Sequence, residues 1–237
     1  MKFKIFLCCV VLHTVTFGQQ SSANEVLELL DRNFFSANME YDMEMSIYKK
    51  EKVKRSYFMH VFKKDDKLRL EIVKPNIEKD RRILNDGDNL WMYLPRSSKL
   101  IKIPYKQAFL GGDASNRDIL RVSLVDDYKV TKMETNNETQ ILYLEANDLS
   151  VSYNKVIFYL NRENFAPIKQ EMQSLSGKTI KTINYEDIEV IDGKYIPTRF
   201  TIVDALQGDT KTVFLYSNLL LEVHQPDVFF TTGSLSK

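Results

Sequence analysis

The sequence predicts a mainly β fold in a single domain, in the form of an antiparallel barrel or half-barrel. Three observations support this prediction: runs in which apolar and polar residues alternate, turn pairs between those runs, and only two short stretches with helical character. Alternation with a period of two is typical of half-buried strands, because successive side chains point to opposite faces of a sheet. About a dozen strands joined by short turns cannot form a flat open sheet, so we expect the sheet to curve.

The first residues have the pattern of a secretory signal peptide. Lys2 and Lys4 precede an apolar run at 5–12, which is too short to span a bilayer. Thr16 and Gly18 are small residues at the positions that a signal peptidase reads. We therefore expect residues 1–18 to be removed in export to the periplasm and residues 19–237 to form one domain.

Both cysteines of the chain, Cys8 and Cys9, lie in this first segment. The processed chain would therefore have no disulfide, no catalytic thiol and no thiolate metal ligand. Leu7 precedes Cys8, where attachment of a lipid anchor requires a small residue, so we expect a soluble protein. The 33 basic and 32 acidic residues nearly balance, and this balance argues against strong binding to nucleic acid.

Two stretches predict helices. Ser22 and Glu25 have the spacing of a capping box, and apolar residues at helical spacing follow as far as 37. Later, Gly111-Gly112 leads into Asp113 and Ser115, either of which can cap a short helix ending near Leu124. We expect this second segment to lie across one mouth of the curved sheet.

The remaining runs predict strands, and turn pairs such as Asp86-Gly87 and Asp192-Gly193 separate many of them. The runs lie at 39–47, 53–62, 68–73, 82–84, 90–94, 100–103, 128–133, 140–144, 155–160, 168–175, 179–185, 195–203 and 211–221. The sequence contains no repeat or linker that would divide these runs between two domains.

The usual constellations of catalysis and metal binding are missing from the sequence. His60 and His224 are the only histidines beyond the first segment, and they form neither an HExxH motif nor another close pair. No GxSxG sequence offers a serine nucleophile. We therefore expect a binding protein without enzymatic activity, cofactor or metal.

Flexible and aromatic side chains are abundant on the predicted strands. Methionine adapts its shape to variable apolar ligands, and in several strands both faces are apolar or aromatic. One interpretation is a hydrophobic cavity; the other is a barrel filled by its own side chains. If there is a cavity, the residues predicted to line it are Met43, Met45, Phe58, Leu70, Trp91 and Tyr93.

Several motifs occur along the chain. A basic hairpin at 63–67 leads into an alternating strand that ends at Pro75, and the sequence DGDNLWMYLP follows at 86–95. These stretches resemble the pattern of the LolA and LolB family of lipoprotein carriers. The sequence PDVFFT at 226–231 is similar to the closing phenylalanine-threonine strand of the family. The segment 111–114 is similar to a GSDF stretch, with Gly112 in place of serine and Ala114 in place of phenylalanine.

The resemblance implies a curved antiparallel half-barrel of about eleven strands, with short helices as a lid. Its function would be to shelter the acyl chains of a lipoprotein that crosses the periplasm, between a donor transporter in the inner membrane and an acceptor in the outer membrane. A basic residue in the first hairpins of the family helps to retain cargo, and Lys64 best matches that position. The protein is expected to be a monomer.

Two other functions are compatible with the same fold. One is a lipid-binding accessory protein of an RND-type exporter, which would hold a glycolipid or another lipid. The other is a sensor or adaptor domain with a filled interior, which would bind a protein through an edge strand.

Overall fold

The computed structural model describes residues 22–34, 38–120, 123–148 and 151–236. The predicted signal segment and its cleavage site lie outside these residues. Within them, no helix is long and apolar enough to cross a membrane.

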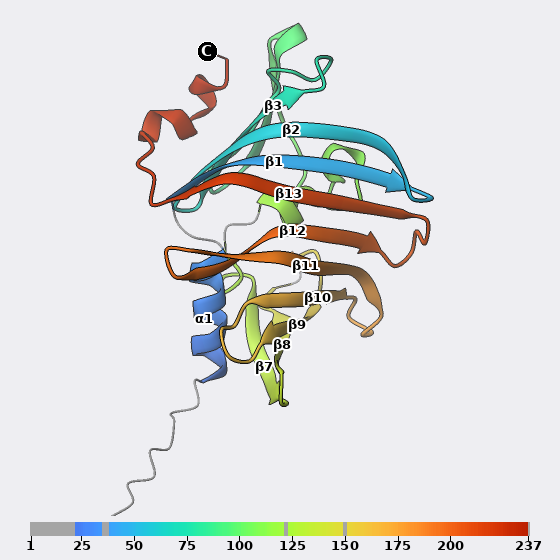
Figure 1. Ribbon diagram of the computed structural model, residues 1–237. Coiled ribbons are helices and arrows are strands. Elements are labelled where there is room, and N and C mark those ends of the chain that lie inside the picture. The colour runs from blue at the N-terminus through green and yellow to red at the C-terminus, as the bar shows by residue number, and fades with distance from the viewer. Residues whose placement is uncertain (1–21, 35–37, 121–122, 149–150, 237) are drawn as a thin grey trace, which may run out of the picture.

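One antiparallel sheet makes up most of the molecule (Figure 1). Its strand order is β6-β5-β4-β3-β2-β1-β13-β12-β11-β10-β9-β8-β7, so two meanders meet where the first strand pairs with the last. The strands are β1 (Asn38–Lys49), β2 (Lys52–Lys64), β3 (Lys67–Lys74), β4 (Arg82–Asn85), β5 (Leu90–Leu94), β6 (Lys99–Lys102), β7 (Tyr128–Thr135), β8 (Thr139–Ala146), β9 (Lys155–Asn161), β10 (Pro167–Gln173), β11 (Thr179–Ile191), β12 (Lys194–Asp204) and β13 (Thr210–Leu221).

The strand predictions are confirmed run by run. Each alternating run corresponds to one strand, and the sheet has thirteen strands rather than about eleven. The figure of about eleven came from the family resemblance, whereas the thirteen runs of the sequence match the thirteen strands.

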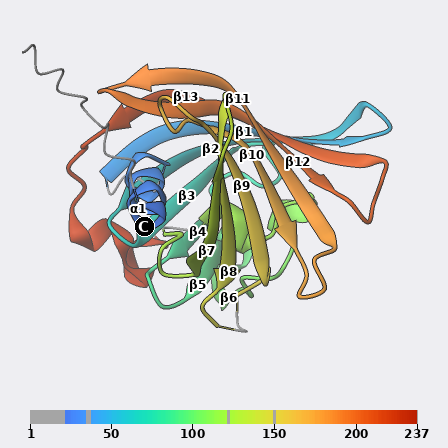
Figure 2. The same ribbon diagram turned by 90° about the horizontal axis from the view of Figure 1, so that it is seen from below.

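Alternation determines which residues face inward. In β1 the odd-numbered residues from Met39 to Met45 are buried, whereas Glu40, Asp42 and Glu44 between them are only partly buried. The sheet curves around α1 (Ala23–Phe34) and the segment that contains α2 (Asn116–Leu120), as Figure 2 shows. The inward residues of nearly all the strands join these helices in one hydrophobic core on the concave face.

Both predicted helices form, although the second is shorter than expected. In α1 the capping box is present: the Glu25 carboxylate accepts a hydrogen bond from Ser22 N (2.7 Å), and Glu25 N donates to Ser22 Oγ (3.3 Å). The second helix comprises Asn116–Leu120, and Leu124, where it was expected to end, is not helical. Residues 121–122, like residues 35–37 at the expected end of the first helix, lie outside the described residues.

The C-terminal segment differs from its prediction. Instead of a closing strand it forms two short 3-10 helices, η3 (Asp227–Phe230) and η4 (Thr232–Ser234); the others are η1 (Pro95–Ser97) and η2 (Phe109–Gly111). Phe230 and Leu235 pack with Leu84 on the outer face of the sheet. Arg69 holds the segment there, since it donates hydrogen bonds to Phe229 O (3.0 Å) and Ser234 Oγ (2.8 Å). These contacts fix the segment across β3 to β5, where no further strand is added.

Candidate functional site

A cavity of about 60 Å³ lies on the concave face of the sheet, beneath α2. Its apolar wall is formed by Met39, Leu68, Ile119, Met172, Ile183, Ile196, Pro197 and Phe200. Its polar wall is formed by Tyr41, Lys63, Asp118, Gln170, Tyr185 and Tyr216. A cavity needs roughly 10–15 Å³ to hold one water, so this one has room for about four waters.

Two polar atoms in the wall lack hydrogen-bond partners among the described residues: Asp118 Oδ1 and Gln170 Nε2. The side chain of Asp118 has 0% exposure, and its other oxygen accepts hydrogen bonds from Ser115 N (2.7 Å), Tyr153 Oη (3.1 Å) and Lys181 Nζ (3.2 Å). Gln170 Oε1 accepts a hydrogen bond from Tyr185 (2.9 Å). Because unpaired buried polar atoms are costly, the cavity suits water at this end.

Two tyrosines line the cavity where β1 meets β13. The rings of Tyr41 and Tyr216 have centroids 4.5 Å apart. Burial raises the pKa of Tyr41 to about 12 and raises the pKa of Tyr216 well above its ordinary value. Both hydroxyls therefore stay protonated and neutral near pH 7.

Lys63 of β2 is the cationic residue in the wall of this cavity, and it is 3% exposed. Burial lowers the pKa of its amine to about 8. Lys64, predicted to retain cargo, lies on the opposite face, where its amine donates to Gln225 O (3.0 Å) and Asp227 Oδ1 (2.5 Å). In β2 every second residue from Tyr57 onward faces inward, so Lys63 faces the cavity and Lys64 faces outward.

The six residues predicted to line a cavity divide between the two faces of the sheet. Met43, Met45 and Leu70 are fully buried on the concave face, but they pack in the core beside the cavity rather than line it. Phe58 is 41% exposed on the outer face, and Trp91 and Tyr93 pack there against the C-terminal segment. These three therefore do not belong to the cavity.

Several cavity residues were missed by the sequence analysis. Tyr41 and Lys63 could have been found, because both follow the alternation of their strands. Gln170 likewise lies on the buried face of β10 with Met172. Asp118 carries no such signal, because its place in the wall depends on how α2 lies across the sheet.

A lid covers the cavity side of the sheet; we use this name for α1, residues 104–120 and residues 123–127. Val26, Leu27 and Leu30 of α1 are buried in the main core. Asp31 joins the two parts of the lid, because its carboxylate accepts hydrogen bonds from Ser123 Oγ (3.1 Å) and from Leu124 N.

The glycine-rich segment 111–114 fastens the other side of the lid to the sheet. A Cβ at Gly112 would lie 2.6 Å from Met45 Cε and 2.9 Å from Thr212 Oγ1, so a larger residue here would force these side chains to shift. Asp113 accepts hydrogen bonds from the hydroxyls of Thr210 (2.5 Å) and Thr212 (2.7 Å) on β13. The departures from the GSDF pattern therefore accompany a tight contact with the concave face.

The described residues contain no group of three side chains that could hold a metal ion. His60 lies on the outer face of β2, where it pairs with Asp42 of β1. The arrangement on the concave face is that of a binding site: an apolar cavity with a few polar groups beneath the lid.

Comparisons with known proteins agree with this description. A protein-family model described as "-like: Uncharacterized protein" matches residues 64–237, and a search of curated proteins finds no match. Two solved structures share the fold at lower identity. A DUF1329 family protein from Desulfovibrio piger is 20% identical, with a TM-score of 0.77 over 90% of this chain and 97% of that chain. An outer membrane lipoprotein-sorting protein domain from Vibrio parahaemolyticus is 17% identical, with a TM-score of 0.76 over 91% and 100%.

A third solved structure is more similar in sequence. It is a LolA superfamily protein from Nitrosomonas europaea, which is 30% identical and has a TM-score of 0.79 over 90% of this chain and 99% of that chain. On this similarity, together with the curved sheet and its helical lid, the chain belongs to the LolA superfamily.

Proposed function

We propose that this protein carries acyl chains through the periplasm and shelters them between the concave face of its sheet and its lid. The cargo is the lipid part of a lipoprotein on its way toward the outer membrane. Burial of an acyl chain is worth about 0.8 kcal/mol per methylene, so exposing a chain of roughly 16 carbons to water costs on the order of 13 kcal/mol. Such a chain needs a carrier, and the transfer needs no catalysis.

The observation that carries the proposal is the cavity enclosed by a curved sheet and a lid. Its walls combine methionine, aliphatic and aromatic side chains, which adapt to flexible apolar ligands. The membership of the LolA superfamily and the fold shared with a lipoprotein-sorting domain support the same function.

The size of the cavity implies that the lid moves when cargo binds. Ligand pockets usually enclose about 300–1,000 Å³, whereas this cavity encloses about 60 Å³. The core residues next to it, including Met43, Met45 and Leu70, then become available to the cargo. An acyl chain that displaces the lid replaces the apolar contacts between lid and sheet with contacts of similar area. The exchange is nearly balanced in free energy, so cargo can be both loaded and released.

One observation favours a second function. Because most of the concave face is packed, the protein could instead be a sensor or adaptor domain that has a filled interior and binds a protein partner. That function predicts no lipid in the native protein.

Native mass spectrometry of the protein purified from its own periplasm separates these functions. A bound lipoprotein supports the proposed carrier. A free glycolipid or other lipid indicates an accessory protein of an exporter. A protein without lipid, isolated in a detergent-free preparation, contradicts the carrier and supports the adaptor.

A further inference from the structure

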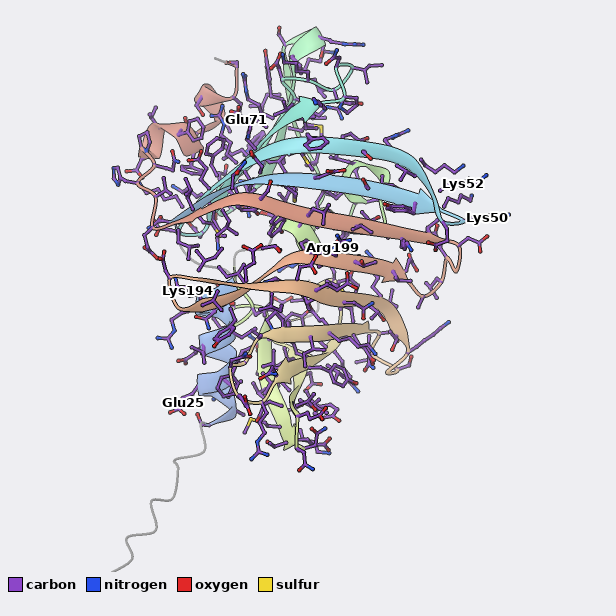
Figure 3. The ribbon with its side chains drawn as sticks, in the orientation of Figure 1. Glu25, Lys50, Lys52, Glu71, Lys194 and Arg199 are labelled. Atoms are coloured by element: carbon purple, nitrogen blue, oxygen red, sulfur yellow. The ribbon has the colours of Figure 1, made fainter. Side chains whose placement is uncertain are left out.

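The sheet is incompletely paired at one internal position, between β12 and β13. The two strands pair only from Arg199 with Leu215 to Ile202 with Thr212. Each continues well beyond this point on its other side: β12 pairs with β11 as far as Lys194, and β13 pairs with β1 as far as Leu221. Figures 1 and 3 show the strands together near Arg199 and separated toward Lys194.

Local irregularities coincide with the separation. Pro197 of β12 lacks a backbone N–H, and proline inside a sheet is confined to edges and irregular positions. On β13, Asn218 has a positive φ of 52°, and the register with β1 shifts between Glu40 and Asp42. An irregularity of this kind bends a strand, so the separation has a cause in both strands.

The separation lies between the internal cavity and a groove on the outer face. The groove encloses about 650 Å³. Tyr216 lines both spaces, and the consecutive residues Pro197 and Thr198 line the cavity and the groove respectively. Met59, whose side chain belongs to the concave core, also lines the groove. The two spaces therefore approach each other through the sheet at this position.

We propose that this separation is a side opening, formed by residues 196–198 of β12 and 216–217 of β13, through which an acyl chain passes into the cavity while its polar head stays in the outer groove. This inference rests on the proposed function and adds the route and orientation of the cargo. The ligand class is an amphiphile with an apolar chain and a polar head, such as the acylated end of a lipoprotein.

The chemistry of the two spaces matches such an amphiphile. The outer groove combines apolar side chains, among them Phe58, Val73 and Leu215, with polar groups. Among the polar groups, Asp42 contacts His60 and accepts a hydrogen bond from Asn218 Nδ2 (2.7 Å), and Asp187 pairs with Arg199 beside the groove (2.8 Å). The cavity wall next to the opening is apolar, with Ile196, Pro197 and Phe200. A polar head can therefore keep its hydrogen bonds outside while the chain is removed from water.

Aromatic rings occupy the opening in the present structure. Tyr216 lies against Tyr41 (4.5 Å between ring centroids) and against Phe200 (5.2 Å, edge to face). Rotation of the Tyr216 side chain toward the outer groove would connect the two spaces. Expansion of the cavity itself still requires movement of the lid.

Fluorescence quenching tests the orientation of a bound chain. In a Trp91→Phe background, a reporter tryptophan is placed at the opening by Leu215→Trp or, independently, at the exposed groove position by Ser217→Trp. Two stearates are bound, one with a nitroxide beside its carboxylate and one with a nitroxide at its methyl end. We expect the carboxylate-side nitroxide to quench both reporters at least twice as strongly as the methyl-end nitroxide.

Lys211→Trp is the matched control, because Lys211 lies on the same face of the same strand, about 14 Å from Leu215 at 3.4 Å per residue. It should be quenched weakly and equally by both probes. Binding is measured separately by displacement of a fluorescent fatty acid. If stearate binds but quenches the opening reporters weakly, or in the reverse order, the side opening is wrong and the carrier function stands. If no stearate or lipopeptide binds, both are wrong.

Discussion

Lys63 places an amine on a concave face that is otherwise mostly apolar. Desolvation by burial is the largest cause of its lowered pKa, and the charges of Asp31 and Asp65 partly oppose the shift. A buried cation reduces stability unless its interactions offset the lost hydration.

The stability of the protein should depend on pH through Lys63. The amine has a pKa of about 8 in the folded protein against an ordinary value of 10.5. Between these values the unfolded chain binds the extra proton, so the unfolding free energy rises with pH, and below about pH 8 this gain is absent. From pH 8 to pH 9.5 the unfolding free energy rises by about 2 kcal/mol, since one pH unit in this range is worth about 1.4 kcal/mol.

Urea unfolding of the native protein and of Lys63→Met from pH 7 to pH 9.5 measures this effect. The difference in unfolding free energy between the two should change in favour of the native protein as the pH rises. Lys64→Met removes the same charge from the opposite face and is the control. If the difference in unfolding free energy between the native protein and Lys63→Met varies with pH no more than the difference for the control, the linkage to Lys63 is wrong.

At the scale of the elements, the sequence predicted the strands because their periodicity is local. All thirteen runs became strands, and the Ser22 capping box became the start of α1. The closing segment at 226–231 became a 3-10 helix, because its burial depends on Arg69 and Leu84, which are distant in sequence. Local patterns cannot report such contacts.

The lid should open more readily when Asp31 is removed. Asp31→Ala deletes the acceptor of Leu124 N and Ser123 Oγ. Leaving a buried donor without a partner costs about 1–3 kcal/mol, which favours the open lid roughly 5- to 150-fold. We expect faster amide hydrogen exchange in α1 and at least fivefold faster uptake of a fluorescent fatty acid.

Glu28→Ala is the control for this change, because Glu28 lies on the exposed side of the same helix. It should leave both rates nearly unchanged. Faster exchange in α1 without faster uptake would mean that the lid is not on the path of the cargo.

At the scale of the whole molecule, the sequence could predict the apolar character of the cavity but not which residues line it. The abundance of methionine and aromatic residues indicated an adaptable interior, yet Phe58, Trp91 and Tyr93 face the other side of the sheet. A strand with apolar residues on both faces does not reveal which face is concave. The side opening was equally hidden, since Pro197 lies within a run that otherwise predicts an ordinary strand.

Cargo binding should stabilise the whole molecule, because an acyl chain held between sheet and lid binds only the folded state. For one site, ligand at 100 times its dissociation constant raises the unfolding free energy by about 2.7 kcal/mol. A diacylated peptide should produce this increase in urea unfolding, while the same peptide without acyl chains should produce none. A filled adaptor domain would respond to neither peptide through its interior. Equal stabilisation by both peptides would mean that the peptide part is recognised and the acyl chains are not, and the carrier function would then be wrong.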